Sequence, residues 1–313
     1  MDTTAEPLVE VDQLTRRFGP RRGVTDVSFT ISPGEVFGFL GPNGAGKSTT
    51  IRLLLGLYRP TSGRMRVFGL DPTRDGVAIN RRVGYLPGEL ALPPKLTGTQ
   101  LLDRFASFRG LTDRTYRDAL SKRFGAQLDQ PVRTLSKGNR QKLGIVLAFM
   151  HRPELLVLDE PTSGLDPLMQ DEFAHLVRET VDDGRTVLLS SHDLEEVQQL
   201  GDRLAIIKEG RIIVTDSVEG LRRSAPRTVD LWFEGDVDTA QITDLDGVEL
   251  RGHEDGRYTF SVTGTVAELL STAGRLGAVD ISARRADLDE LFLSYYRDAA
   301  DGGTTGGEVT DAH

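Results

Sequence analysis

Hydrophobic and polar positions change their period repeatedly along this chain, and the changes predict alternating strands and helices. Residues 8–18 and 23–31 alternate apolar and polar side chains, which predicts two strands with one buried face each. The continuously apolar run VFGFLG at 36–41 predicts a strand buried on both faces. The segment IRLLLGL at 51–57 follows a helical period and predicts an amphipathic helix.

The same alternation continues to about residue 222. Helices are expected at 97–130, 171–183 and 193–201, where apolar residues recur at helical spacing. Strands alternating with helices indicate an α/β fold with a parallel sheet wrapped by crossover helices. Further strands are predicted at 65–70, 83–87, 155–161, 186–192 and 203–208.

Beyond residue 222 the pattern changes to a small α+β unit. Strand-like segments alternate with two amphipathic segments, of which the last is DLDELFLSYYRD at 287–298. The end of the chain is rich in Gly, Thr and Asp and has little to bury. We therefore expect a first domain over 7–220, a small α+β domain over 222–297 and a disordered tail over 298–313.

Composition narrows the chemistry. The chain has 313 residues, 38% of them hydrophobic, a formal net charge of −9 and no cysteine. Disulfides, thiolate metal sites and cysteine nucleophiles are excluded, and broad nucleic-acid binding is disfavoured by the acidic charge. The N-terminus does not resemble a secretory signal, and no apolar run approaches the ~20 residues that cross a bilayer. A role at a membrane would require another chain.

Residues 41–48, GPNGAGKS, match the phosphate-binding pattern G-x-x-x-x-G-K-[ST] between a buried strand and a helix. Gly44 and Gly46 allow the backbone to curl around a phosphate, Lys47 reaches the β and γ oxygens, and Ser48 can ligate Mg²⁺. A Gly-rich turn with a surface lysine is the alternative, which the flanking strand and helix disfavour. Phosphate contacts are expected from Gly41, Pro42, Asn43, Gly44, Ala45, Gly46, Lys47, Ser48 and Thr49.

Two further groups suit nucleotide hydrolysis. LLVLDEP places Asp159 at the end of a buried strand, where it would hold Mg²⁺, and Glu160 next to it, where it could orient or deprotonate a water. An acidic pair at a helix N-terminus is the alternative. In LLSSHDLEE, His192 lies at a strand-to-helix corner and could bond the γ-phosphate or the water. Alternatively Asp193 simply caps the next helix and His192 is exposed.

In this order, GPNGAGKS, LSKGNRQK, LLVLDEP, SGLD and the histidine of SSHD resemble the ATP-binding subunit of ABC transporters over about residues 7–220. The resemblance implies a P-loop ATPase cassette with N-terminal antiparallel strands and a helical subdomain at about 88–150. It also implies that the signature loop at 135–142 faces the ATP of a second subunit, with contacts from Ser136, Gly138 and Asn139. The loop SGLD at 163–166 would then lie along that subunit interface. Phe18 matches the aromatic that stacks on adenine, although it could instead be a core residue at a strand end.

The chain departs from the family in two loops. Gly88 stands where the family usually has a Gln that senses Mg²⁺, and we hypothesise that the carboxylate of Glu89 substitutes for it. In the signature loop, Lys137 replaces a Gly and Asn139 a Gln, while the serine and the closing glycine remain. Similar substitutions occur in export-type members, so we expect an active site.

The resemblance implies an ATPase that uses ATP and Mg²⁺ to power export, of a drug or lipophilic compound, through a separate membrane permease. Its partners would be a second ATP-binding subunit, as a homodimer, and the permease, docked on the region of residues 88–130 at the cytoplasmic face of the membrane. The alternatives are a soluble ATPase acting on nucleic acid or the ribosome, and a non-hydrolysing regulatory cassette. The chain has one phosphate-binding loop, residues 41–48, called the cradle below, and no long coiled coil, which disfavours an ATPase acting on nucleic acid or the ribosome. Glu160 disfavours a non-hydrolysing cassette. The small second domain would stabilise the dimer or regulate it, or simply be a module without a ligand.

Overall fold

The computed structural model describes residues 6–19, 21–235 and 237–284. The chain divides into two compact units, Met1–Asp216 and Ser217–His313. The domain boundary expected at residue 220 falls inside helix α8 (Val218–Ser224), which belongs to the second unit. The expected last helix at 287–298 and the expected disordered tail lie outside the described residues.

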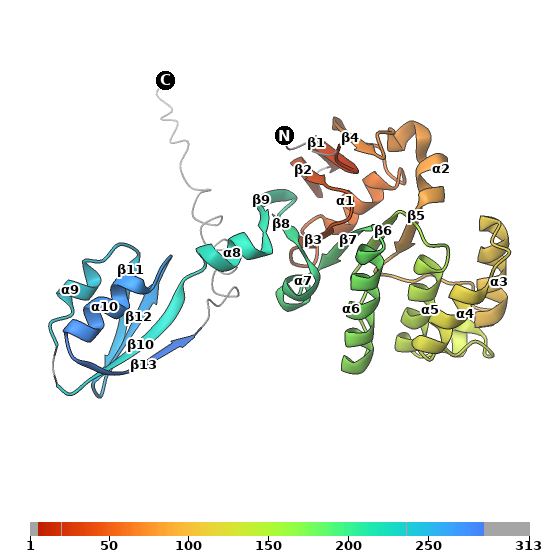
Figure 1. Ribbon diagram of the computed structural model, residues 1–313. Coiled ribbons are helices and arrows are strands. Elements are labelled where there is room, and N and C mark those ends of the chain that lie inside the picture. Colours follow the sequence, from red (N-terminus) through yellow and green to blue (C-terminus); the bar gives the residue numbers. More distant parts are fainter. Residues whose placement is uncertain (1–5, 20, 236, 285–313) are drawn as a thin grey trace, which may run out of the picture. The chain divides into compact units, whose positions relative to one another are not determined.

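A six-stranded sheet forms the centre of the first unit (Figure 1). Its strand order is β5-β6-β7-β3-β8-β9, and the neighbours from β5 to β8 run parallel. This is the parallel sheet that the apolar runs predicted. The strands are β3 (Val36–Leu40), β5 (Val83–Leu86), β6 (Leu155–Asp159), β7 (Thr186–Ser191), β8 (Arg203–Lys208) and β9 (Arg211–Ser217).

Each face of this sheet packs into a different core, which explains why its strands are apolar at successive positions. In β6, Leu156 and Leu158 join a core with α5 and α6, whereas Leu155 and Val157 join a core with α1. In Figure 1, α1 and α6 accordingly lie on opposite sides of these strands. The helices of this unit are α1 (Lys47–Leu54), α2 (Pro72–Arg82), α3 (Gly98–Arg109), α4 (Thr115–Arg123), α5 (Lys137–Phe149), α6 (Pro167–Asp182) and α7 (Leu194–Leu200).

An antiparallel sheet of order β2-β1-β4 covers α1. Its alternating pattern buries Val9, Val11 and Phe29 against the helix residue Ile51. The helical segment between β5 and β6 contains α3, α4, a short 3₁₀ turn at Val132–Thr134 and α5. The strands of this sheet are β1 (Val9–Phe18), β2 (Arg21–Ile31) and β4 (Ser62–Val67).

In the first unit, helix α2 and strand β9 were missing from the sequence-based prediction. Helix α2 buries only Pro72 and Ile79, so it has almost no apolar period, and its start is marked by the Asp71 cap, which accepts a hydrogen bond from the Thr73 backbone N–H. Strand β9 is half-exposed along most of its length. Weak burial removes the periodic signal on which such a prediction depends.

Within its described residues, the second unit has an antiparallel sheet of order β11-β12-β10-β13 and three helices, of which α8 is the first. Val229, Leu231 and Phe260 are central to its own hydrophobic core. The elements after α8 are β10 (Arg227–Phe233), α9 (Ala240–Thr243), β11 (Val248–Glu254), β12 (Arg257–Val262), α10 (Ala267–Arg275) and β13 (Ala278–Arg284).

Candidate functional site

The site lies at the carboxyl ends of β6, β7 and β3, which are neighbours in the sheet. Because these strands are parallel, the residues that follow them meet at one edge. Gly41 follows β3, Glu160 follows β6 and His192 follows β7. The strand order thus brings together three motifs that are far apart in the sequence.

The loop between β3 and α1 is shaped to hold an anion. Gly44 and Gly46 have positive φ angles of 82° and 114°, which favour glycine. A Cβ on Gly46 would lie only 2.7 Å from Val24 Cγ1, so the backbone packs closely there. Gly46 caps α1 without a side-chain hydrogen bond. The first N–H groups of the helix are therefore available to phosphate oxygens, which the helix dipole also favours.

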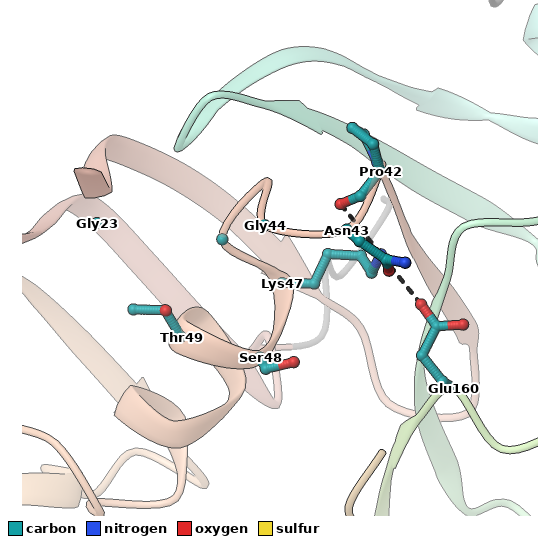
Figure 2. Close-up of a pocket in the computed structure, with 9 residues that line it drawn as sticks. Gly23, Pro42, Asn43, Gly44, Lys47, Ser48, Thr49 and Glu160 are labelled. Atoms are coloured by element: carbon teal, nitrogen blue, oxygen red, sulfur yellow. Dashed lines mark hydrogen bonds and ion pairs between the residues drawn. The ribbon is translucent and has the colours of Figure 1, made fainter. Parts of the chain in front are cut away.

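Lys47 extends from the start of α1 across this loop toward Glu160 (Figure 2). Its Nζ lies 3.0 Å from Glu160 Oε1 and also donates to the Gly41 carbonyl. Lys47 is only 5% exposed, so the ion pair is screened little by solvent. Gly41 and Ala45, which belong to the same loop, are buried. The pocket itself is lined by Gly23, Pro42, Asn43, Gly44, Gly46, Lys47, Ser48, Thr49 and Glu160.

Glu160 also contacts His192, whose Nδ1 lies 2.6 Å from Glu160 Oε2. Glu160 adopts a positive φ of 52°, which is uncommon outside glycine, and its N–H donates to the Ser190 carbonyl at 3.1 Å. Asp193 caps α7 and His192 is exposed, yet the His192 side chain also reaches the Glu160 carboxylate. A bond from His192 to the γ-phosphate or the water stays a prediction. A carboxylate held by a lysine and a histidine is suited to orienting a water.

Two oxygen donors of the site fit Mg²⁺. The buried Asp159 carboxylate accepts a hydrogen bond from Ser190 Oγ at 2.5 Å, and Ser48 lines the phosphate pocket. Within the described residues, no group of three or more His, Cys, Asp or Glu could hold a metal by itself. Mg²⁺ commonly binds through one or two protein oxygens, phosphate oxygens and water, and these residues suit that mode.

Gly88, rather than Glu89, lies next to the Asp159 carboxylate, which is a candidate Mg²⁺ ligand. A Cβ on Gly88 would lie 3.6 Å from Asp159 Oδ2, so this position faces the site as the family pattern implies. Glu89 is exposed. Its hypothesised role as a substitute ligand stays a prediction, which normal Mg²⁺ dependence of hydrolysis in a Glu89→Ala variant would refute.

The signature loop begins α5 and does not line this pocket. Ser136 is exposed and caps the helix, because its Oγ accepts the Asn139 backbone N–H at 3.1 Å and the Asn139 side-chain amide at 3.2 Å. Gly138 packs so closely on the loop after Glu160 that a Cβ would lie 2.8 Å from the Gly164 carbonyl oxygen. The expected nucleotide contacts from Ser136, Gly138 and Asn139 are therefore separate from the phosphate pocket of the same chain.

Phe18 does not line the pocket either. Its half-buried ring meets Tyr58 edge-on, with 5.4 Å between ring centroids, and the Arg16 guanidinium lies 4.8 Å from its centroid. The assignment of Phe18 to adenine stacking stays a prediction.

Three polar residues that support the site were missed from the sequence. Gln141 is buried in α5 and donates to the Pro161 carbonyl at 2.6 Å, which ties the signature helix to the segment after Glu160. Ser190 holds Asp159, and Glu196 holds Ser191. A polar residue at a helix position turned toward the core was the available signal for Gln141 and Glu196.

Comparison with known proteins identifies the family. The family model described as ABC transporter matches residues 24–163. The daunorubicin/doxorubicin resistance ATP-binding protein DrrA of Streptomyces peucetius is 37% identical over 321 residues of alignment, which cover 97% of each chain. The chain belongs to the ATP-binding proteins of ABC transporters.

A second relative and a solved structure support the same family assignment. The linearmycin resistance ATP-binding protein LnrL of Bacillus subtilis is 30% identical over 309 residues, 92% of this chain and 97% of LnrL. A solved structure of an ATP-binding subunit of an ABC transporter has a TM-score of 0.64 and 32% identity, covering 69% of this chain and 92% of that one. The predicted fold class, a P-loop cassette on a parallel sheet, is confirmed.

This ABC protein is an ATP-binding and ATP-hydrolysing subunit of the export type. The relatives do not favour the alternative of an ATPase acting on nucleic acid or the ribosome. Among the residues described, no helix is long and apolar enough to span a bilayer. ATP-binding subunits of this family associate with membrane permeases and form dimers.

Proposed function

We propose that two copies of this chain clamp ATP and Mg²⁺ between them, and that this cycle drives a separate permease to export a lipophilic, drug-like compound. The chain would act at the cytoplasmic face of the membrane, attached through the permease. ATP would favour the closed pair because some of its contacts exist only there, and hydrolysis would release it.

One observation supports the two-copy arrangement most strongly. The pocket around Lys47 is lined by residues 23, 42–44, 46–49 and 160 and by none from the signature loop. Yet Ser136 opens a helix of 13 residues at an exposed N-terminus, where the dipole favours an anion. A second copy would bring this helix end to the γ-phosphate and complete the site.

Within this site the residues have distinct proposed roles. Lys47 and the N–H groups of the loop hold the β- and γ-phosphates, and Ser48 and Asp159 hold Mg²⁺, directly or through water. The metal neutralises charge that develops on the phosphate oxygens. Glu160 orients or deprotonates the attacking water, while His192 fixes the Glu160 carboxylate and contacts the γ-phosphate side.

A Glu160→Gln variant tests these roles. Gln keeps the size of the side chain but cannot take a proton, so we expect ATP binding to persist, the dimer to be trapped and turnover to be lost. Nucleotide binding, chromatographic size with ATP and ATPase rate would be measured, with Glu195→Gln as the exposed control. Hydrolysis at the normal rate in Glu160→Gln would contradict the catalytic assignment.

The permease has a candidate docking surface in a groove of about 1020 Å³ between the end of α1, α2 and α3. Leu57, Val77 and Phe108 expose 59%, 75% and 79% of their surface there, and clustered exposed apolar side chains mark interaction sites. The α3 part of the groove lies within the predicted docking region at 88–130. Unchanged co-purification of the permease with a Phe108→Asp variant would exclude this groove.

The substrate class is proposed from the relatives. DrrA is named for resistance to daunorubicin and doxorubicin, and LnrL for resistance to linearmycin. The direct test is to purify the chain with its permease and to ask which lipophilic compounds raise its ATPase rate. A complex that no such compound stimulates would contradict the proposed class.

A further inference from the structure

Glu196 is a half-buried residue with a buried carboxylate oxygen, which the nucleotide-binding motifs leave unexplained. It lies in α7, four residues after His192. Its Oε1 is buried and has no hydrogen-bond partner among the residues that the structure describes. A buried acceptor without a partner is costly and rare in folded proteins, so its place beside the site requires a reason.

The carboxylate holds the turn that carries His192. Ser191 Oγ donates to Glu196 Oε2 at 2.5 Å and accepts the Asp193 backbone N–H at 3.0 Å. One hydroxyl therefore fixes the residues on both sides of His192, and Glu196 fixes that hydroxyl. His192 in turn lies 2.6 Å from Glu160 through its Nδ1.

The same carboxylate reaches the segment that follows Glu160. The Thr162 hydroxyl is close enough to stabilise the ionised form of Glu196, and the charge of Glu160 acts on it as well. Burial is the largest influence and raises the pKa of Glu196 to about 7. Glu196 thus bonds the turn that carries His192 and lies near the segment that follows Glu160.

We infer that Glu196 is a positioning residue for ATP hydrolysis, which sets the geometry of His192 against Glu160 by anchoring Ser191. The inference rests on the proposed roles of Glu160 and His192. Small displacements of an acting group reduce rates strongly, and residues that orient the reacting groups typically contribute tenfold to a hundredfold. Because Glu196 does not line the phosphate pocket, it should affect turnover rather than ATP binding.

The test compares kcat and KM for ATP in the full-length chain with Mg²⁺. We expect Glu196→Ala to lower kcat about tenfold or more while KM changes by less than about twofold. Glu196→Gln retains an oxygen that accepts from Ser191 and should keep most of the activity. Ser191→Ala should resemble Glu196→Ala, and the double variant should be no slower. Glu195→Ala, the exposed neighbour, is the matched control and should equal the wild type.

Two outcomes would overturn the inference. One is a normal kcat in Glu196→Ala or, if that variant does not fold, in Ser191→Ala. The other is a parallel loss of kcat, ATP binding and thermal stability that Gln does not rescue, which would indicate a structural role only. Glu160→Gln is assayed in parallel: its activity would refute the proposed function, whereas an inactive Glu160→Gln beside a normal Glu196→Ala would refute only this inference.

Discussion

Glu160 connects the parts of the site because its two carboxylate oxygens serve different partners. Oε1 pairs with Lys47 and Oε2 with His192. A γ-phosphate would compete with Oε1 for the Lys47 ammonium, and a carboxylate released from that pair could act on a water. The sequence identified Lys47 by the phosphate-binding motif, and Glu160 and His192 by their places directly after strands. The direct contact between Lys47 and Glu160 could not be predicted, because it depends on side-chain rotamers at a closely packed edge.

At the same scale, the stability of the fold should depend on pH through Glu196. Burial raises its pKa from an ordinary value of 4.5 to about 7. Below pH 4.5 both the folded and the unfolded state are protonated. As the pH rises toward 7 the unfolded state loses this proton first, so the free energy of unfolding falls, by on the order of 3 kcal/mol for this group.

A Glu196→Gln variant cannot ionise and should lack this contribution. Chemical denaturation at pH 5 and pH 8 measures it: relative to the wild type, the variant should gain stability at pH 8. Glu195→Gln should show the wild-type pH dependence. An equal difference between Glu196→Gln and the wild type at both pH values would contradict the raised pKa.

At the scale of elements, the predictable part of the fold was the part with strong burial. The apolar runs of β3, β6 and β7 indicated buried strands, and their parallel arrangement implied that Gly41, Glu160 and His192 share an edge. The order in which these strands pair, and the edge positions of β5 and β9, depend on long-range packing that no local pattern encodes. The role of Gln141 was missed for the same reason, because the Pro161 carbonyl that it bonds lies in a different part of the chain.

The first turn of α5 and the loop after β6 pack closely against each other. Gly138 approaches Gly164, Lys137 Nζ donates to Ser163 Oγ at 2.9 Å, and Gln141 holds the Pro161 carbonyl. Lys137 stands where the family usually has glycine, which has no side chain to make the bond to Ser163. Movement of the signature helix should therefore reach the segment that begins at Glu160.

A Gly138→Ala variant tests this packing. Its Cβ would meet the Gly164 carbonyl oxygen at 2.8 Å, so the two segments must separate, at about 1–3 kcal/mol of stability. We expect the ATPase rate to fall about tenfold while the single copy still binds nucleotide, because Gly138 does not line the pocket of its own chain. Gly274→Ala in α10, where a Cβ meets nothing within 4 Å, is the control. A normal rate in Gly138→Ala would argue against the coupling.

At the scale of the whole molecule, the proposed arrangement gives each copy two half-sites that serve different nucleotides. The cradle with Lys47 and Glu160 would hold one ATP, and the signature helix with Ser136 would complete the site of another copy. In a two-fold pair each surface meets its complement twice, so two such copies would form two equivalent sites. The resemblance of the motifs predicted this arrangement, whereas composition and periodicity indicated only a P-loop ATPase.

Mixing two inactive variants tests this arrangement most directly. Lys47→Ala destroys the cradle and Ser136→Arg blocks the signature helix, so each homodimer should be inactive. A mixed dimer would keep one intact site, formed by Lys47 of one copy and Ser136 of the other. An equal mixture should therefore recover about a quarter of the wild-type ATPase rate if pairing is random and the sites act independently. A mixture that stays as inactive as its components would contradict a nucleotide site shared between two copies.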